Sequence, residues 1–383
     1  MPFDLSSALA AREAAGLKRQ RICLDSGQGR QIRVADRSYL NFSGNDYLGA
    51  AGRPELVQAW QAGLALWGAG SGASPLVTGY SLPHARLEAQ LCDWLGVEAA
   101  LLFSTGFAAN QAVIKALLGK DHLQWQDRLN HASLQEAGAA SPARMKRFAH
   151  NDMTQLRQLL EPKRGLIISE GVFSMDGDQA PLAELVALSQ ASGNWLMIDD
   201  AHGLGVLGAA GRGSLAQQGV AAGQVQILMG TFGKALGCAG AFVAGSRDLV
   251  DYLANFAREY VYSTHLPPAQ AEAISAAIAW VQQADGAREQ LQAHIALFRQ
   301  GAARLGLTLG DSQTAIQPLL VGESEQALAL AQRLRQRGLW VTAIRPPTVP
   351  AGQARLRLTL TAAHRREDIV HLLAALEEGW HGR

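Results

Sequence analysis

Four short apolar runs, each followed by a polar turn, constrain the fold of this chain more than any other feature. Residues 99–103, 166–168, 195–198 and 225–229 make up these runs, and helical patterns lie between them. Strands that alternate with helices are typical of a mostly parallel sheet covered by helices. We therefore expect an α/β fold whose large domain is built on a mostly parallel central sheet.

A single lysine stands between glycines directly after the last of these runs, in the sequence GTFGKALG (230–237). Most lysines with glycine neighbours lie in solvated loops. A lysine becomes a nucleophile when burial or a neighbouring cation lowers its pKa, and its commonest covalent product is a Schiff base with a carbonyl group or with pyridoxal phosphate (PLP). Lys234 is therefore a candidate catalytic residue that needs support from other residues.

Asp199 and His202 supply that support, because they follow the preceding apolar run. In an open parallel sheet, ligands bind at the carboxyl ends of the strands, so we expect Asp199, His202 and Lys234 to face one crevice. An aspartate beside the pyridine nitrogen keeps that nitrogen protonated, which PLP needs in order to act as an electron sink. The three residues together predict a PLP site.

The turn over residues 104–110 follows the first run and opens a helical pattern. A helix that begins there exposes free N–H groups and the positive end of its dipole, which suit a phosphate. An ordinary strand-to-helix connection explains the same pattern equally well. Glu170 and Ser174 follow another run, and a lone histidine such as His131 is more often structural than catalytic.

Several other classes of function are disfavoured. The glycine-rich stretch 68–75 follows a helix and meets a proline, so it does not fit a dinucleotide-binding fingerprint. The sequence contains no GxSxG and no HExxH motif, which argues against serine hydrolases and zinc proteases, and we expect no metal site. A net charge of +1 offers no basic surface for nucleic acid.

The cysteines and the N-terminal residues bear on location. The three cysteines are widely spaced and form no CxxC pair, which is typical of a reducing cytoplasm. Asp4 is an acid where a signal peptide has basic residues, and polar residues interrupt every apolar stretch before it reaches the length of a membrane span. We therefore expect a cytoplasmic protein that does not interact with membranes.

The length of the chain and its patterns predict more than one domain. We expect an N-terminal helix and arm over residues 1–45, a large PLP-binding α/β domain over 46–285 and a small C-terminal α+β domain over 286–383. A long helix over 269–297 is expected to link the two main domains.

Two groups of basic residues are candidates for binding an anionic substrate. The alternating residues 355–360 are expected to place their leucines toward the core and Arg355 and Arg357 on the opposite face, where arginines are usually solvated but can bind a carboxylate. A basic cluster that includes Arg19 ends a helical pattern over residues 4–21. A solvated helix end is the simpler interpretation of that cluster, and a cationic clamp is the alternative.

Motifs distributed over most of the chain resemble the α-oxoamine synthase family of fold-type I PLP-dependent enzymes. They occur in the family's order: NFSGNDYLG (41–49), STGFAANQ (104–111), DRLNHASL (127–134), SEGVFSMDGD (169–178), IDDAHGLGVLG (198–208), GTFGKALG (230–237), YSTHLPP (262–268) and IRPPTVPAGQARLRLTLTAAH (344–364). The resemblance implies the fold-type I architecture. Departures are few: Ala73, Pro75 and Ala241 stand where the family pattern has Gly, Arg and Gly.

The resemblance also implies how the cofactor is held. Lys234 would form the Schiff base with PLP, Asp199 would pair with the pyridine nitrogen, His202 would meet the ring hydroxyl, and His131 would stack on the ring. The remaining cofactor contacts would come from Gly106, Phe107, Ser174, Thr231, Ser263 and Thr264.

For the substrates, the resemblance places Arg357 where the family binds the amino-acid carboxylate. Arg19 and Thr348 stand where a member that uses pimeloyl substrates meets its acyl donor, and Arg21 lies close enough to Arg19 for the choice between them to stay open. His131 and Asn45 are further substrate-binding candidates.

The family's site lies at a dimer interface. The resemblance therefore implies a homodimer with shared active sites, in which Asn45, Ser263 and Thr264 are contributed by the partner subunit.

The final motif favours a family member that joins L-alanine to a pimeloyl thioester, carried by coenzyme A or by a carrier protein, with release of CO2 and free thiol. Two alternatives stay open. One is a sibling enzyme that joins glycine to acetyl-CoA or succinyl-CoA. The other is a non-catalytic PLP-binding protein, which would never exchange the α-proton of an amino acid.

Overall fold

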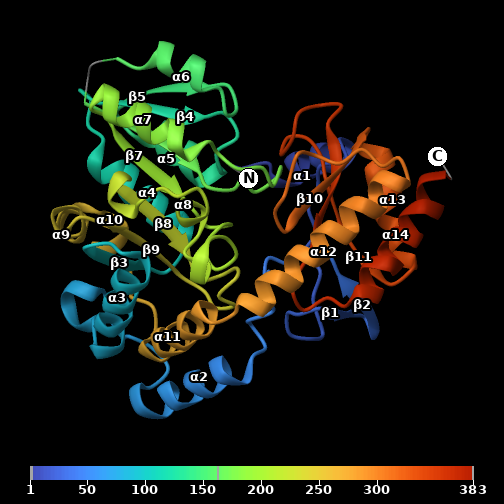
Figure 1. The fold of residues 1–383 in the computed structure, drawn as a ribbon, viewed down its shortest axis with the longest axis horizontal. Helices are drawn as coiled ribbons and strands as arrows, with labels where there is room; N and C mark the ends of the chain where they lie inside the picture. The colour runs from blue at the N-terminus through green and yellow to red at the C-terminus, as the bar shows by residue number, and fades with distance from the viewer. Residues whose placement is uncertain (1–2, 162–163, 382–383) are drawn as a thin grey trace.

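The computed structural model describes residues 3–161 and 164–381, and it has two lobes (Figure 1). The larger lobe contains a central sheet with helices on both sides. The smaller lobe contains the C-terminal elements together with strands from the N-terminal part of the chain. Helix α12 (Asp285–Arg304) runs between the two lobes.

The strands of the large sheet lie in the order β3-β9-β8-β7-β6-β4-β5. Neighbouring strands are parallel except around β9, which lies antiparallel between β3 and β8. This arrangement confirms the expected α/β fold with a mostly parallel central sheet, and the four apolar runs form β3, β6, β7 and β8. The strand bounds are β3 Ala99–Phe103, β4 Leu123–Asp127, β5 Arg144–Phe148, β6 Gly165–Glu170, β7 Trp195–Asp199, β8 Ile227–Thr231 and β9 Ala241–Gly245.

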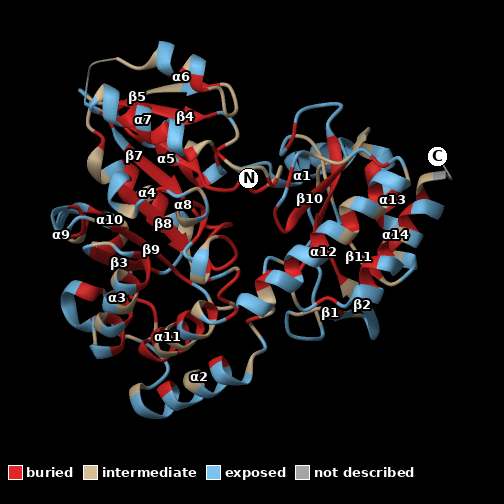
Figure 2. Cartoon of the chain, in the orientation of Figure 1, coloured by how far each residue is buried: buried red, intermediate tan, exposed pale blue. Residues whose placement is uncertain are grey.

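The strands of this sheet are largely buried (Figure 2), and apolar clusters on its two faces hold the helices in place. On β7, Leu196 and Ile198 belong to one cluster and Met197 to the other, because successive side chains on a strand point to opposite faces. Strands that are buried on both faces read as continuous apolar runs. One face packs against α4 (Gly106–Leu117), α5 (Ala132–Ala140) and α9 (Arg247–Phe256), and the other against α3 (Leu82–Leu95), α6 (Met153–Leu159), α7 (Leu182–Ser192) and α11 (Pro268–Gln282).

In the smaller lobe, β13 lies between β10 and β12 and is antiparallel to both. A second small sheet pairs β2 with β1 and, in parallel, with β11. Residues 31–41 therefore join the lobe of the C-terminal residues, and the division at 45 and 285 stays a proposal. The bounds are β1 Gln31–Val34, β2 Arg37–Asn41, β10 Ile316–Gly322, β11 Leu339–Trp340, β12 Thr342–Ile344, β13 Ala354–Thr359, α13 Ser324–Gln336 and α14 Arg366–His381.

Two helix predictions were wrong in their extent. The linking helix expected over 269–297 is two helices, because α11 ends at Gln282 and α12 begins at Asp285, whose carboxylate suits a helix N-terminus. The helix expected over 4–21 ends at Ala14, since Gly16 has a φ of 63°, a left-handed conformation that is common at helix ends. The remaining α-helices are α1 Leu5–Ala14, α2 Pro54–Trp67, α8 Ser214–Gln217 and α10 Arg258–Val261.

Within the part of the chain that the structure describes, every helix is too short or too polar to cross a bilayer. The same residues contain no group of three His, Cys, Asp or Glu side chains arranged to hold a metal ion.

Candidate active site

Lys234 lies on the turn after β8, and its side chain points at a histidine. Its Nζ lies 2.7 Å from Nε2 of His202, which follows β7. The hydroxyl of Tyr47 lies 2.6 Å from the other ring nitrogen, Nδ1. A neutral imidazole has one N–H and one acceptor, so one of these two neighbours donates to the ring and the other accepts from it.

Burial and charge set the protonation of this pair. Burial lowers the pKa of Lys234 to about 8, although Asp199 and Glu170 oppose the shift. Burial also holds the pKa of His202 well below its usual value, and the neighbouring Lys234 and Arg357 add to this effect. The site therefore holds a neutral imidazole next to an amine that loses its proton far more readily than an ordinary lysine.

Asp199 ends β7 and forms one wall of the site. Its Oδ2 accepts a hydrogen bond of 2.8 Å from the side-chain amide of Asn110 on α4, and its Oδ1 accepts one of 3.0 Å from the backbone N–H of Ala201. The Asn110 amide also donates to the hydroxyl of Ser133 at 2.9 Å, and that hydroxyl lies 2.8 Å from Nδ1 of His131. This chain of contacts fixes the carboxylate and the imidazole relative to each other.

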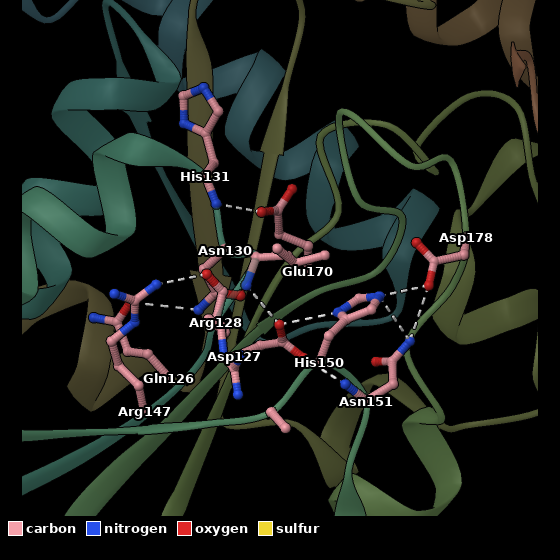
Figure 3. A network of polar contacts seen from close by, with 12 residues as sticks. Gln126, Asp127, Arg128, Asn130, His131, Arg147, His150, Asn151, Glu170 and Asp178 are labelled. Carbon is pink, nitrogen blue, oxygen red and sulfur yellow. Dashed lines mark hydrogen bonds and ion pairs between the residues drawn. The ribbon is translucent and has the colours of Figure 1, made fainter. Parts of the chain in front are cut away.

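Glu170 is the last residue of β6 and lies next to the backbone of His131. The backbone N–H of His131 donates to the Glu170 carboxyl group (Figure 3). Complete burial raises the pKa of Glu170 well above its usual value, and the negative charge of Asp199 raises it further. Glu170 therefore holds a proton more readily than an ordinary glutamate does.

These side chains enclose a cavity of about 190 Å³ at the carboxyl end of the sheet. Asp199, His202 and Lys234 all line it, as the strand order predicted for residues at the ends of neighbouring parallel strands. The lining residues are Gly106, Phe107, Asn110, His131, Ser133, Glu170, Asp199, Ala201, His202, Met229, Thr231 and Lys234.

The residues present fit PLP. Helix α4 begins at Gly106, so its first N–H groups have no partner within the helix and lie at the positive end of the helix dipole, where a phosphate binds well. Oδ1 of Asn110 is buried and has no hydrogen-bond partner among the described residues, so the wall beside Asp199 can accept one more donor. PLP needs an amine, a carboxylate and a site that binds its phosphate, and the residues of this cavity supply all three.

Arg357 lies beside this cavity and is 7% exposed, so the first of the two interpretations of its sheet face, a solvated arginine, is excluded. The segment that follows β6 covers that face: Nε of Arg357 donates to the carbonyl of Ser174 at 2.7 Å. Its terminal nitrogens each lie 3.3 Å from Oδ1 of Asn45. Arg355 is buried as well, in an ion pair of 2.5 Å with Asp176.

The hydrogen-bond acceptors that hold Arg357 are all neutral. They are a carbonyl, an amide and the hydroxyl of Thr359, and none of the described residues forms an ion pair with it. A buried guanidinium without a carboxylate partner is costly unless a ligand completes its surroundings. Arg357 is therefore suited to bind a substrate carboxylate.

Other residues predicted for the site lie outside the lining of this cavity. Asn45 was expected from the partner subunit, but the structure places it against Arg357 and Tyr47 of its own chain. Ser263 and Thr264 are exposed and do not line the cavity, although the carbonyl of Thr264 accepts from Ser104 just before α4.

Ser174 contributes its carbonyl to Arg357 and is likewise outside the cavity lining. Arg19 and Thr348 line a separate groove next to α13, whose lining does not include Arg21.

Two residues that hold the site together were not predicted from the sequence. Asn110 donates a hydrogen bond to Asp199, and Tyr47 contacts His202. Both residues belong to motifs quoted from the sequence, but neither was assigned a role there. A polar residue among the apolar and small neighbours of a helix, as Asn110 is, signals a buried polar contact. Tyr47 carried no such signal, because its partner is distant in the sequence.

A second histidine cluster lies at the same end of the sheet (Figure 3). His150 follows β5, and its ring nitrogens lie 3.0 Å from Asp127 and 2.6 Å from Asp178. Burial lowers the pKa of His150, but hydrogen bonds to the two aspartates outweigh it and raise the pKa to about 10. His150 is therefore a cation at neutral pH.

Solved structures with the same fold define the class of the chain. A serine palmitoyltransferase from Sphingomonas wittichii aligns with a TM-score of 0.94 and 31% identity over 100% of this chain and 98% of its own. One from S. paucimobilis with a bound PLP–myriocin aldimine aligns with a TM-score of 0.93 and 28% identity over 100% and 98%. The fold is that of the fold-type I PLP-dependent transferases.

Residues 37–376 match the family model of aminotransferase class I and II. The 8-amino-7-oxononanoate synthase of Aeromonas hydrophila is 67% identical over 98% of this chain and 94% of its own length, and that of Yersinia pestis is 54% identical over 97% of each. The chain therefore belongs to the aminotransferase class I and II family and, within it, to the 8-amino-7-oxononanoate synthases.

Proposed function

We propose that the chain binds PLP and catalyses the decarboxylative condensation of L-alanine with a pimeloyl thioester, a reaction of biotin biosynthesis. A bond forms between the α-carbon of alanine and the thioester carbonyl carbon, the carbon–sulfur bond breaks, and the alanine carboxyl group leaves as CO2. The products are 8-amino-7-oxononanoate, CO2 and free thiol. The observation that carries the proposal is the cavity that joins Lys234, with its lowered pKa, to Asp199.

PLP, when bound, supplies an electron sink for the negative charge that develops on the α-carbon of the substrate. Lys234 would hold the cofactor covalently, and Asp199 would keep the pyridine nitrogen protonated. The N-terminal N–H groups of α4 at Gly106 and Phe107, with Thr231, would bind the phosphate. His131 would pack against the ring.

Lys234 would also take the proton from the α-carbon. An amine with a pKa of about 8 is partly neutral at physiological pH, whereas an ordinary lysine is not. The Nζ of Lys234 lies against the neutral ring of His202, so this ring adds no positive charge that would oppose proton uptake at Nζ. These properties suit a general base.

Arg357 would bind the carboxylate of L-alanine. It is buried, it has only neutral partners in the described chain, and Asn45 and Ser174 fix its guanidinium group. Arg19 and Thr348 would contact the pimeloyl chain or its carrier from the neighbouring groove.

The proposal includes a homodimer in which a second copy completes the site through Ser263 and Thr264. Large apolar side chains support it, because Leu66, Val77 and Tyr262 are each 70% exposed or more. Exposed apolar surface of this kind marks protein interfaces. A cytoplasmic location is also part of the proposal, supported by cysteines that are all free.

The test is thiol release by the PLP-loaded protein from pimeloyl-CoA, with L-alanine and with glycine in parallel. We expect release with alanine well above that with glycine. Lys234→Ala should lower turnover by at least about 10³-fold, because it removes both the covalent anchor and the base. Lys120→Ala, at an exposed lysine, is the control and should match the wild type.

Two outcomes would contradict the proposal. Retained turnover in Lys234→Ala would exclude the assigned base. Release from acetyl-CoA with glycine, and none from pimeloyl-CoA, would keep the fold and the Lys234 chemistry but assign the chain to a sibling reaction.

A further inference from the structure

Arg355 is buried on the same strand as Arg357 but has a different partner. Both residues lie on β13 of the smaller lobe, where residues two apart point to the same face of the sheet. The guanidinium of Arg355 forms an ion pair of 2.5 Å with Asp176, which belongs to the larger lobe. This ion pair therefore joins the two lobes beside the guanidinium that is suited to bind a carboxylate.

The segment over residues 172–179 follows β6 and folds back on itself through an antiparallel bridge between its two ends. It contacts β13 at two points. The carbonyl of Ser174 accepts a hydrogen bond of 2.7 Å from Arg357, and the carboxylate of Asp176 accepts one from Arg355. The two contacts are spaced by two residues on the segment and by two residues on the strand. The segment therefore lies along β13 instead of touching it at a single point.

The tip of the 172–179 segment is also fixed to the smaller lobe. The carbonyl of Gly177 accepts hydrogen bonds from the hydroxyl groups of Ser312 at 3.0 Å and of Thr314 at 2.9 Å. A Cβ at Gly177 would lie 2.4 Å from the carbonyl oxygen of Ile316, so only glycine fits at this contact between the lobes. The segment therefore connects the lobes through close and specific contacts.

Under the proposed function, the two ends of the amino acid are bound by different lobes. Lys234 follows β8 in the larger lobe, whereas Arg357 lies on β13 in the smaller lobe. Productive geometry at a site has to be held within about 0.5 Å, so the placement of one lobe on the other decides how well both groups reach one small molecule. The carbonyl of Ser174 orients Arg357, and the ion pair of Asp176 with Arg355 fixes that carbonyl to the same strand.

From these contacts we infer that Asp176 and Arg355 are positioning residues, whose ion pair holds the 172–179 segment against β13 so that Arg357 faces the carboxylate of the amino acid. The inference rests on the proposed function, because it takes Arg357 as the group that binds this carboxylate. Asp176 and Arg355 are already paired with each other, so their substitution should change amino-acid binding through Arg357 and not through a contact of their own.

The test compares two amines that bind to the PLP-loaded protein, L-alanine and ethylamine, which is alanine without its carboxylate. Titration calorimetry gives both affinities. We expect Asp176→Asn and Arg355→Gln each to lower the ratio of the alanine affinity to the ethylamine affinity roughly tenfold, because a displaced guanidinium loses part of its charged hydrogen bonding. Arg357→Gln should lower the same ratio by roughly 10²-fold, since it removes the guanidinium itself. The ethylamine affinity should stay unchanged in all three variants.

The Arg357→Gln background separates a positioning role from a general loss of structure. Asp176→Asn should have no further effect on the alanine affinity there, because the group through which it acts is absent. In turnover, Asp176→Asn should raise KM for L-alanine and leave KM for the pimeloyl donor unchanged. Arg355→Lys keeps the positive charge, so it should retain more of the preference for alanine than Arg355→Gln does.

The matched control is Glu161→Gln. Glu161 forms an ion pair of 2.5 Å with Lys146, and this pair has the same length as that of Asp176 with Arg355 and similar burial. Lys146 lies on β5 in the larger lobe, and neither member of the pair lines the cavity around Lys234. Loss of this ion pair should therefore leave the ratio of the two affinities unchanged.

Three results would overturn the inference. A ratio that falls in Arg357→Gln but not in Asp176→Asn or Arg355→Gln would show that the ion pair does not position the guanidinium, while the proposed carboxylate site would stand. An unchanged ratio in Arg357→Gln would remove the inference together with the role assigned to Arg357. Equal losses of alanine and ethylamine affinity in Asp176→Asn and Arg355→Gln would show that the ion pair has only a structural role.

A failure of the proposed reaction gives a different result. If the wild type releases no thiol from any pimeloyl donor, but its preference for alanine falls in Asp176→Asn and in Arg355→Gln, the reaction is wrongly assigned and the positioning role is confirmed.

Discussion

Two histidines at the carboxyl end of the same sheet differ in charge because of their neighbours. His202 follows β7 and lies between Lys234 and Tyr47, and its pKa is held well below the usual value by burial and by nearby cations. His150 follows β5 and lies between two aspartates, and its pKa is raised to about 10. An unperturbed histidine side chain has a pKa of about 6.5, so the surroundings of the two rings cause the difference between them.

The difference separates a reactive site from a structural one. A neutral His202 can exchange a hydrogen bond with Lys234 without opposing proton uptake there. A cationic His150 ties Asp127 at the end of β4 to Asp178. Asp178 lies in the same segment as Ser174, whose carbonyl accepts a hydrogen bond from Arg357. The contacts of His150 therefore stabilise the segment that covers Arg357 beside the Lys234 cavity.

The largest difference in turnover is expected between substitutions of Asp199, in the Lys234 cavity, and of Asp178, which pairs with His150. Asp199→Asn should lower kcat by about 10³-fold, because a neutral amide cannot keep the pyridine nitrogen protonated. Asp178→Asn should keep turnover within about threefold of the wild type and should instead lower the thermal midpoint. Both variants are assayed for thiol release and for thermal unfolding. Equal losses of turnover in the two would remove the distinction between the clusters.

An intermediate effect is expected from His150→Gln, which should lower the free energy of unfolding by roughly 2–3 kcal/mol at pH 7 because the buried Asp127 and the half-buried Asp178 lose their cation. The folded pKa of His150 is about 10 and the unfolded value about 6.5, so this stabilisation is complete below pH 6.5 and is lost as the pH rises through 10. The gap in unfolding free energy between wild type and variant should therefore narrow from pH 7 to pH 10.

The control for His150→Gln is His122→Gln. His122 accepts a hydrogen bond from the backbone N–H of Gly119 at 2.9 Å and has no part in either cluster. Its substitution should lower the free energy of unfolding at pH 7 far less than His150→Gln does, because its ring pairs with no carboxylate. A gap for His150→Gln that is constant from pH 7 to pH 10 would show that the ring is not a cation in the folded protein.

The smallest effect is expected from Tyr47→Phe, which removes the hydroxyl that lies 2.6 Å from Nδ1 of His202. Loss of one neutral hydrogen bond should lower kcat about threefold to tenfold. Tyr252→Phe removes a hydroxyl that donates to a backbone carbonyl on the surface at 3.1 Å, and it should have no effect on kcat. A loss of more than about 10²-fold in Tyr47→Phe would assign the tyrosine a direct role in proton transfer.

Local pattern was sufficient to predict the sheet and the residues at its strand ends. Asp199, His202 and Lys234 each follow a buried strand, and parallel strands bring their carboxyl ends to one edge, so their meeting needed no knowledge of packing. The same reasoning left the surroundings of Arg357 open, because alternation along a strand does not say what covers the other face. That cover is the segment around Ser174, which is distant from Arg357 in the sequence.

The sequence by itself determined the order of strands and helices, the fold class and the reactive groups, because these depend on periodicity and on residues close together along the chain. Only the tertiary structure decided the state of those groups. Burial and long-range neighbours lower the pKa of Lys234 and of His202 and raise that of His150. A pKa depends on the charges and the solvent within a few ångströms, and these come from parts of the chain that meet only after folding.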